Sequence, residues 1–331
     1  MIRAIKLFAS LRLVLLGMGL LAAGVLVNIN IHQHVFYIVV PLTLLAVNLA
    51  AALLTNRLLR QNPGLSIFHI SLLVLLVLIA YGRMTYFKGR VEITQGQDLP
   101  SAVVTTTARG PWHKLPFTRV NFEQGPIAVD YAAGLMRRDT RSTVKIIGAS
   151  GKGDSQIIGD DEPLRLDNYR FYTTSNKGFA ALVEWTGVSG DSVLGAIHFP
   201  SYPALEWKQY AEWTTPAGQP LKLELKLPKV PEKKDWTLSN KYGLALVIVS
   251  DDNRSVQLQS GDELIVDNGT VRLIDVRLWM GYRVFYDPTL SLLFIVAVTG
   301  VLGLTWHIRK KLWVATTAMS GTTDGVMTQH G

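Results

Sequence analysis

The sequence predicts a membrane protein with four transmembrane α-helices and a large β-rich extracytoplasmic domain inserted between helices 3 and 4. Four stretches are apolar and long enough to span a bilayer, which takes about 20 helical residues. They run approximately from Phe8 to Val27, Val35 to Leu54, Leu65 to Gly82 and Leu290 to His307. A long polar segment with short alternating runs separates the third stretch from the fourth. We expect three helices in residues 1–83, the β-rich domain in 84–287, the fourth helix with its basic end in 288–314 and a flexible cytoplasmic tail in 315–331.

The positions of lysine and arginine predict the orientation. Basic residues lie at the N-terminus, between the second and third stretches and after the fourth, namely Arg3, Lys6, Arg57, Arg60, Arg309, Lys310 and Lys311. The loop from Asn28 to His34 has none. Because an excess of these residues marks the cytoplasmic side, we expect both termini inside and the polar segment outside the lipid bilayer.

These seven residues and Arg12 explain most of the net charge of +8, since the polar segment itself holds 25 basic and 24 acidic residues. The basic balance is therefore a sign of topology, and we expect no nucleic-acid partner. Cysteine is absent, so the outer domain has no disulfide and the chain has no C-x-x-C-H motif for covalent haem attachment. The first apolar run is long and no A-x-A site follows it, which predicts a retained helix and not a cleaved signal peptide.

The outer segment, from Val91 to Val284, has the pattern of a sandwich or open barrel of mostly antiparallel strands. Alternating or β-branched runs predict strands, and turn residues separate them. The clearest runs are 142–150 (STVKIIGAS), 221–228 (LKLELKLP), 242–250 (YGLALVIVS) and 271–280 (VRLIDVRLWM). Asn268-Gly269 predicts a hairpin after the short strand 263–266 (ELIV). The run 202–213 (YPALEWKQYAEW) predicts a short helix.

No catalytic constellation stands out in the outer segment. It lacks the G-x-S-x-G, H-E-x-x-H and P-loop motifs. His113 and His198 are far apart in the sequence without metal-ligand spacing, so we expect surface or strand-edge histidines. The acidic run from Asp160 to Glu162 is expected to be a solvated loop.

The main candidate site residue is His69. It lies in 65–81 (LSIFHISLLVLLVLIAY), which contains no other basic residue and no acidic one. A polar ring in hydrocarbon is costly unless it has a partner or a ligand, so an intramembrane histidine indicates a functional site. Imidazole is a common axial ligand of haem iron. The alternative is a hydrogen bond to a nearby backbone group or to a hydroxyl such as that of Ser71.

Three parts of the chain occur together in one known family. The first is the pair 67–83 (IFHISLLVLLVLIAYGR) and 87–97 (FKGRVEITQGQ), the second is 162–178 (EPLRLDNYRFYTTSNKG), and the third is 284–314 (VFYDPTLSLLFIVAVTGVLGLTWHIRKKLWV). In this order and at these membrane positions they resemble ResB, a system II cytochrome c biogenesis protein. The first pair is similar to the family's histidine-bearing helix and the strand after it, the second to an aromatic strand after a polar turn, and the third to the exit strand and last span.

The resemblance implies that the chain lies in the bacterial cytoplasmic (inner) membrane. It also implies that the chain is a haem-handling subunit of a holocytochrome c synthase (haem lyase). Such a subunit is not a complete enzyme, and it passes haem b from the inner leaflet to the outer face for attachment to apocytochrome c. The family acts with a ResC/CcsA-type membrane partner that has a tryptophan-rich haem-binding loop. This chain has eight tryptophans but no W-x-x-W-x-W-D-like cluster, so the partner must supply that loop. The outer domain is also short for the family.

The expected haem site consists of His69, His307 and Arg12. His69 would ligate the iron near the inner end of its helix, and the resemblance implies a second axial histidine from the partner. Arg12 either pairs with a haem propionate or extends to the interface. His307 is either a second axial ligand within this chain or an interfacial histidine. His32 and His34 lie in the outer loop, too far across the bilayer to share an iron with His69.

Two other functions stay open at this point. A b-type haem electron-transfer subunit of a membrane redox complex would hold one stable haem between His69 and His307. A non-haem scaffold would bind no haem and would be indifferent to the loss of His69.

Overall fold

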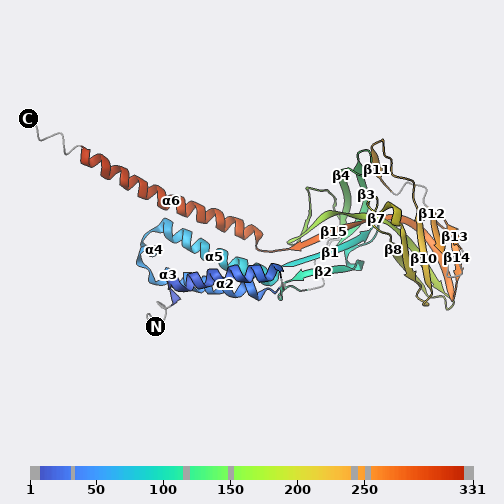
Figure 1. Cartoon of the computed structure of the whole chain (residues 1–331), viewed down its shortest axis with the longest axis horizontal. Coiled ribbons are helices and arrows are strands. Elements are labelled where there is room, and N and C mark those ends of the chain that lie inside the picture. Colours follow the sequence, from blue (N-terminus) through green and yellow to red (C-terminus); the bar gives the residue numbers. More distant parts are fainter. Residues whose placement is uncertain are drawn as a thin grey trace, which may run out of the picture. The chain divides into compact units, whose positions relative to one another are not determined.

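The computed structural model describes residues 8–30, 34–114, 120–147, 153–239, 245–249 and 255–323. The chain divides into two compact units. The helical unit comprises Met1–Phe87, Ala108–His113 and Asp287–Gly331, and the β unit comprises Lys88–Thr107 and Lys114–Tyr286. Figure 1 labels the elements of both.

Within the described ranges, four helices are long and apolar enough to cross a membrane, as predicted. They are α2 (Leu11–Asn30), α3 (Phe36–Thr55), α5 (Pro63–Thr85) and α6 (Leu290–Thr323), and the short helix α4 (Arg57–Gln61) lies between α3 and α5. α5 begins two residues before the predicted Leu65, with Asn62 as N-cap and Pro63 in the first turn, where its missing N–H is not needed.

α6 is longer than predicted. It continues past His307 to Thr323 and so enters the segment expected to be a flexible tail. The physical reason is that no glycine or proline lies between Leu304 and Ser320 to end the helix. Residues 324–331 of the expected tail lie outside the described ranges.

The described strands of the β unit form three sheets. The seven-stranded sheet has the order β2-β1-β15-β7-β6, with β14 beside β15 and β8 beside β7. Its strands are β1 (Phe87–Thr94), β2 (Val104–Arg109), β6 (Leu164–Leu166), β7 (Tyr169–Gly187), β8 (Ser192–His198), β14 (Glu263–Val266) and β15 (Gly269–Tyr286). The long strands β7 and β15 pair along almost their whole length and run side by side in Figure 1.

Two four-stranded sheets complete the unit, in the orders β11-β3-β4-β5 and β13-β12-β10-β9. Their strands are β3 (Phe122–Tyr131), β4 (Arg137–Ile146), β5 (Ser155–Ile158), β9 (Tyr210–Thr214), β10 (Pro220–Lys226), β11 (Trp236–Leu238), β12 (Ala245–Val249) and β13 (Ser255–Leu258). The four predicted strand runs overlap β4, β10, β12 and β15, and the pairing is antiparallel as expected. The division into three sheets was not predicted.

Turn residues set two hairpins of the seven-stranded sheet. The predicted hairpin after ELIV is confirmed, with Val266 opposite Gly269 and Asn268 at φ 60°. A second hairpin joins β6 to β7 through Asp167 (φ 46°) and Asn168 (φ 67°). Two central residues with positive φ form the type I′ turn that matches the twist of antiparallel strands.

The prediction of a helix over residues 202–213 is wrong. Only the single turn η2 (Glu206–Lys208) forms, and Tyr210–Thr214 is strand β9, with Trp213 opposite Leu221 of β10. After η2 the buried side chain of Gln209 donates to the carbonyl oxygen of Leu205 (2.8 Å). Pairing with β10 therefore overrides the weak helical pattern.

A closed ring of three buried hydrogen bonds joins the seven-stranded sheet to the sheet that contains β3 and β4. Tyr282 Oη donates to Gln124 Oε1 (2.5 Å), Gln124 Nε2 donates to Ser142 Oγ (2.8 Å), and Ser142 Oγ can donate to Tyr282 Oη (2.7 Å). All three side chains are fully buried or nearly so, and burial raises the pKa of Tyr282. Each polar group of the ring thus has a partner in a place where a lost partner is costly.

We predict that Tyr282→Phe destabilises the β unit by about 1–3 kcal/mol, because Gln124 and Ser142 then lose a buried partner. Thermal unfolding of the full chain in detergent measures the change. The matched control is Tyr172→Phe on β7, which removes a partly exposed hydroxyl and should shift the midpoint little. Equal midpoints for the two variants would show that the buried ring does not hold the sheets together.

Candidate functional site

α5 and α6 pack closely through small residues. A Cβ added to Gly64 would lie 2.8 Å from the carbonyl oxygen of Gly303, and one added to Gly300 would lie 3.1 Å from Ser71 Cβ. A Cβ on Gly303 would also meet the side chain of Ile67 at 2.7 Å. Small residues that bring helix backbones together are typical of helix contacts in membranes. The side of α5 that faces α6 is therefore the stripe of Gly64, Ile67 and Ser71.

His69 lies on a different side of α5. Because each residue turns an α-helix by about 100°, His69 points about 160° away from Ile67 and from Ser71. The imidazole is partly exposed and meets the ring of Phe68 edge-on, with centroids 5.2 Å apart. The hydroxyl of Ser71, which lies toward Gly300, is thus not the partner of His69.

The partner of His69 is a backbone group of the preceding turn. Nδ1 lies 2.8 Å from the carbonyl oxygen of Leu65. Because a carbonyl oxygen only accepts, Nδ1 carries the proton of this hydrogen bond, and Nε2 keeps its lone pair. Histidines that ligate metals commonly donate their other ring N–H to a carbonyl, which fixes the tautomer and the ring orientation. The hydrogen bond that sequence reasoning treated as the alternative to ligation is therefore compatible with it.

His307 is not brought to His69. Its backbone nitrogen lies 2.8 Å from the Cβ position of Gly64, five residues before His69, which is about 7 Å along the helix. His307 also belongs to α6, which packs on another side of α5 than the one that carries His69. This placement gives no support to the expected pairing of the two histidines on one iron.

Arg12 is exposed in the first turn of α2. That end of α2 is tied to α3 by Asn48, a buried polar residue that sequence reasoning missed. Asn48 Nδ2 donates to the carbonyl oxygens of Phe8 and of Ser10, the latter at 3.0 Å. Asn48 lies seven residues before the end of α3, and His69 lies six residues after the start of α5, the next long helix. Arg12, Asn48 and His69 therefore share a similar depth in the helical unit.

His34 lies at the other end of these helices. His32 falls outside the described residues. His34 precedes α3, and its ring lies 5.4 Å from that of Phe36 and 5.8 Å from that of Tyr37.

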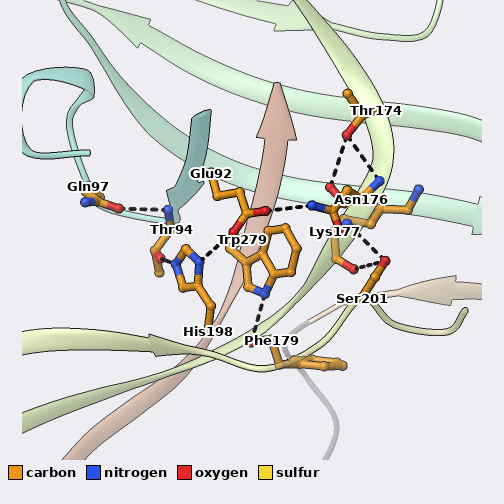
Figure 2. Close-up of polar contacts among 10 residues, drawn as sticks. All are labelled: Glu92, Thr94, Gln97, Thr174, Asn176, Lys177, Phe179, His198, Ser201 and Trp279. Atoms are coloured by element: carbon orange, nitrogen blue, oxygen red, sulfur yellow. Dashed lines mark hydrogen bonds and ion pairs between the residues drawn. The ribbon is translucent and has the colours of Figure 1, made fainter. Parts of the chain in front are cut away.

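The β unit contains a polar cluster around an irregular stretch of β7, drawn in Figure 2. Between Thr173 and Lys177 the register of β7 shifts against β15, where Gly281 faces the extra residues. Thr174 Oγ1 donates to the carbonyl oxygen of Gly281 (2.7 Å). Asn176 Nδ2 donates to Glu92 Oε1 on β1 (2.7 Å). A bulge of this kind redirects side chains, and here it directs Asn176 toward β1.

His198, at the end of edge strand β8, completes the cluster. Its Nδ1 lies 3.3 Å from Glu92 Oε2, and its Nε2 lies 2.7 Å from Thr94 Oγ1. Figure 2 shows the imidazole beside Trp279, and the two rings stack at 6° with centroids 5.2 Å apart. The hydrogen bond from His198, together with its charge and a hydrogen bond from Asn176, lowers the pKa of Glu92 against the opposing effect of burial.

The contacts of this cluster connect the four strands β1, β7, β8 and β15. Both ring nitrogens of His198 have protein partners, and among the described residues no group of three or more histidine and carboxylate side chains could hold a metal. The sequence alone could not reveal the cluster, because its contacts join distant residues, such as Glu92 and His198, which are 106 residues apart.

Lys177 is buried in the same bulge, with only 2% of its surface exposed. Its ammonium lies 5.8 Å from the ring centroid of Tyr131. The nearby carboxylate of Asp160, part of the exposed acidic run, pairs instead with Arg137 (3.3 Å). Burial lowers the pKa of Lys177 to about 8; the charge of Arg137 acts in the same direction and that of Asp160 opposes it.

His113 is not the surface histidine that was expected. It is buried in the helical unit, stacked on Phe87 with centroids 4.9 Å apart, and its Nδ1 lies 3.1 Å from the carbonyl oxygen of Thr85. Burial lowers the pKa of His113. The loop that carries it therefore packs on the C-terminal end of α5.

We predict that Lys177→Met stabilises the full chain near pH 7, by up to about 3 kcal/mol. Below pH 8 the lysine is charged in both the native and the unfolded state, so folding bears the whole cost of burying the charge. Between pH 8 and 10.5 the native lysine is neutral while the unfolded one binds a proton, so wild-type stability rises with pH and the advantage of the variant shrinks. Thermal unfolding at several pH values measures this, with exposed Lys222→Met as control. An advantage that is independent of pH would contradict the buried charge.

Comparison with known protein families identifies the segment that carries both His69 and the polar cluster. The model of the ResB-like family matches residues 61–200, from the end of α4 to the end of β8 and the residues after it. A comparison with curated proteins gave no match to the chain. The family match confirms the resemblance that the sequence motifs predicted. Residues 61–200 of the chain are thus similar to the ResB-like family, and with the four apolar helices this similarity indicates a membrane protein of cytochrome c biogenesis.

Proposed function

We propose that this chain is the haem-handling membrane subunit of a system II cytochrome c synthase. The observation that carries the proposal is His69. It is an imidazole within an apolar helix of membrane-spanning length, and its Nδ1–H is held by the Leu65 carbonyl so that Nε2 can act as a ligand.

The proposed topology places both termini in the cytoplasm and the β unit outside the bacterial inner membrane. The basic residues Arg57 and Arg60 lie between α3 and α5, and Arg309, Lys310 and Lys311 lie on α6 beyond its contact with Gly64. In this arrangement they share the cytoplasmic side, where lysine and arginine accumulate. His69 then lies about 9 Å from the cytoplasmic start of α5.

The residues around His69 fit a haem that enters from the inner leaflet. The same side of α5 carries Leu65, Leu72 and Leu73, which provide an apolar surface that excludes water from the iron. Arg12, at similar depth, would pair with a propionate. Haem supplies the iron and is the cargo that is attached to apocytochrome c.

The second axial ligand would come from a ResC/CcsA-type partner. His307 is on α6, which packs on a side of α5 other than the one that carries His69. It lies about 7 Å nearer to the start of α5 than His69 does, so it is poorly placed to share an iron with His69. The partner would also provide the tryptophan-rich loop that this chain lacks. On this proposal the chain holds and passes haem, and the β unit positions the partner or the incoming apocytochrome.

We predict that the full chain, co-expressed with its partner and purified in detergent, shows a Soret band that His69→Ala lowers by about tenfold or more. The matched control is Leu73→Ala, one helical turn away, which removes a side chain of the same face without removing a ligand. His307→Ala should leave the band in place.

Three outcomes separate the functions. A band that needs the partner supports the synthase subunit. A band that the chain holds alone, and that disappears in both His69→Ala and His307→Ala, would replace the proposal with an electron-transfer subunit. No band in any preparation would leave a non-haem scaffold.

A further inference from the structure

The loop Ala108–His113 belongs to the helical unit, although it directly follows strand β2. It returns to the C-terminal end of α5 and is bound there by backbone hydrogen bonds. Gly110 N donates to the carbonyl oxygen of Tyr86 (2.8 Å), and Trp112 N donates to that of Met84 (2.8 Å). The loop is thus fixed to the end of the helix that sequence analysis places at the outer face.

Gly110 shows how close this approach is. A Cβ at this position would collide with the carbonyl of Met84 and would lie 2.8 Å from the carbonyl oxygen of Arg83. The backbone of the loop therefore touches the last turn of α5. As a result the backbone of Arg109, the residue before Gly110, lies close to the backbone of Arg83.

Both arginines are exposed. Among the residues that the structure describes, neither forms an ion pair. The carboxylate at this end of the unit, Asp287, accepts hydrogen bonds from the N–H (2.9 Å) and hydroxyl (2.6 Å) of Thr289 at the start of α6. The Arg83 guanidinium lies over the ring of Tyr86, 6.0 Å from its centroid, so among the described residues both arginines are left without a carboxylate partner.

Exposed aromatic rings lie beside the two arginines. Trp112 is 59% exposed and Tyr81 is 46% exposed, and their ring centroids are 6.2 Å apart. Tyr81 continues the exposed apolar stripe of α5 formed by Val74 and Val77. Tryptophan and tyrosine at the end of an apolar helix are typical of the headgroup level of a bilayer.

We propose that Arg83 and Arg109, framed by Tyr81 and Trp112, form a binding site for the phosphate of an anionic phospholipid headgroup. The inference rests on the proposed membrane insertion of α5, with which the site is continuous. Guanidinium groups bind phosphate through paired N–H donors, and basic residues near a bilayer attract anionic lipid. The phosphate fills the role of the missing counter-ion, while the two rings lie among the headgroups.

The absence of cysteine allows a clean test. In Pro111→Cys the only thiol would carry an environment-sensitive fluorophore. The labelled full chain is placed in nanodiscs of phosphatidylcholine with or without phosphatidylglycerol. Nitroxide lipids labelled near the headgroup should quench the fluorophore more than lipids labelled at mid-chain. Phosphatidylglycerol should strengthen quenching by a headgroup-labelled anionic lipid.

In the same background, Arg83→Gln and Arg109→Gln should each weaken the apparent affinity for phosphatidylglycerol about fivefold. Arg90→Gln, which removes the same charge from an exposed arginine of β1, should not. Haem absorption should persist in all three variants, so failure here is distinguishable from failure of the haem proposal.

Three results would overturn the lipid site. They are a label that neither nitroxide lipid quenches, a phosphatidylglycerol effect equal in Arg90→Gln and Arg109→Gln, and an equal response of the detergent-solubilised chain to inorganic phosphate. The last result would indicate a site for free phosphate.

Discussion

The polar ring of His69 inside an apolar helix is the constraint on which the account of this protein depends. An imidazole in hydrocarbon needs a partner for each nitrogen, and the Leu65 carbonyl satisfies only Nδ1. The orientation of α5 follows from its contact with α6, where Gly64 and Gly303 leave no room for a side chain. That contact points the partly exposed ring of His69 away from α6.

In the β unit, unlike at His69, a set of buried polar side chains provides hydrogen-bond partners for its own members. Gln124, Ser142 and Tyr282 satisfy one another completely, and they join two sheets. The partly exposed pair of His198 and Glu92 joins strands at the edge of the seven-stranded sheet. Lys177 differs, because its charge is buried against an aromatic ring with no paired carboxylate, and buried atoms such as Asn121 Oδ1 and Gln209 Oε1 also lack a hydrogen-bond partner.

Much of this architecture follows from local sequence, and the rest depends on contacts between distant residues. Apolar stretches predicted the helices, while turn residues such as Asn268 predicted a hairpin, because both signals are local. The helix expected around Glu206 failed, since pairing with β10 decided that segment. His69 was recognisable as the only basic residue in its stretch. Asn48, the partners of His198 and the burial of His113 were not, because each depends on a tertiary contact.

The central claim is that the iron of haem is held by His69 Nε2, and a cavity variant tests it most directly. His69→Gly removes the imidazole and leaves space for a free one. We predict that the variant, co-expressed with its partner, loses the Soret band and regains it when imidazole is added to the detergent-solubilised protein. A His69→Gly variant that keeps the full band without imidazole would contradict the claim.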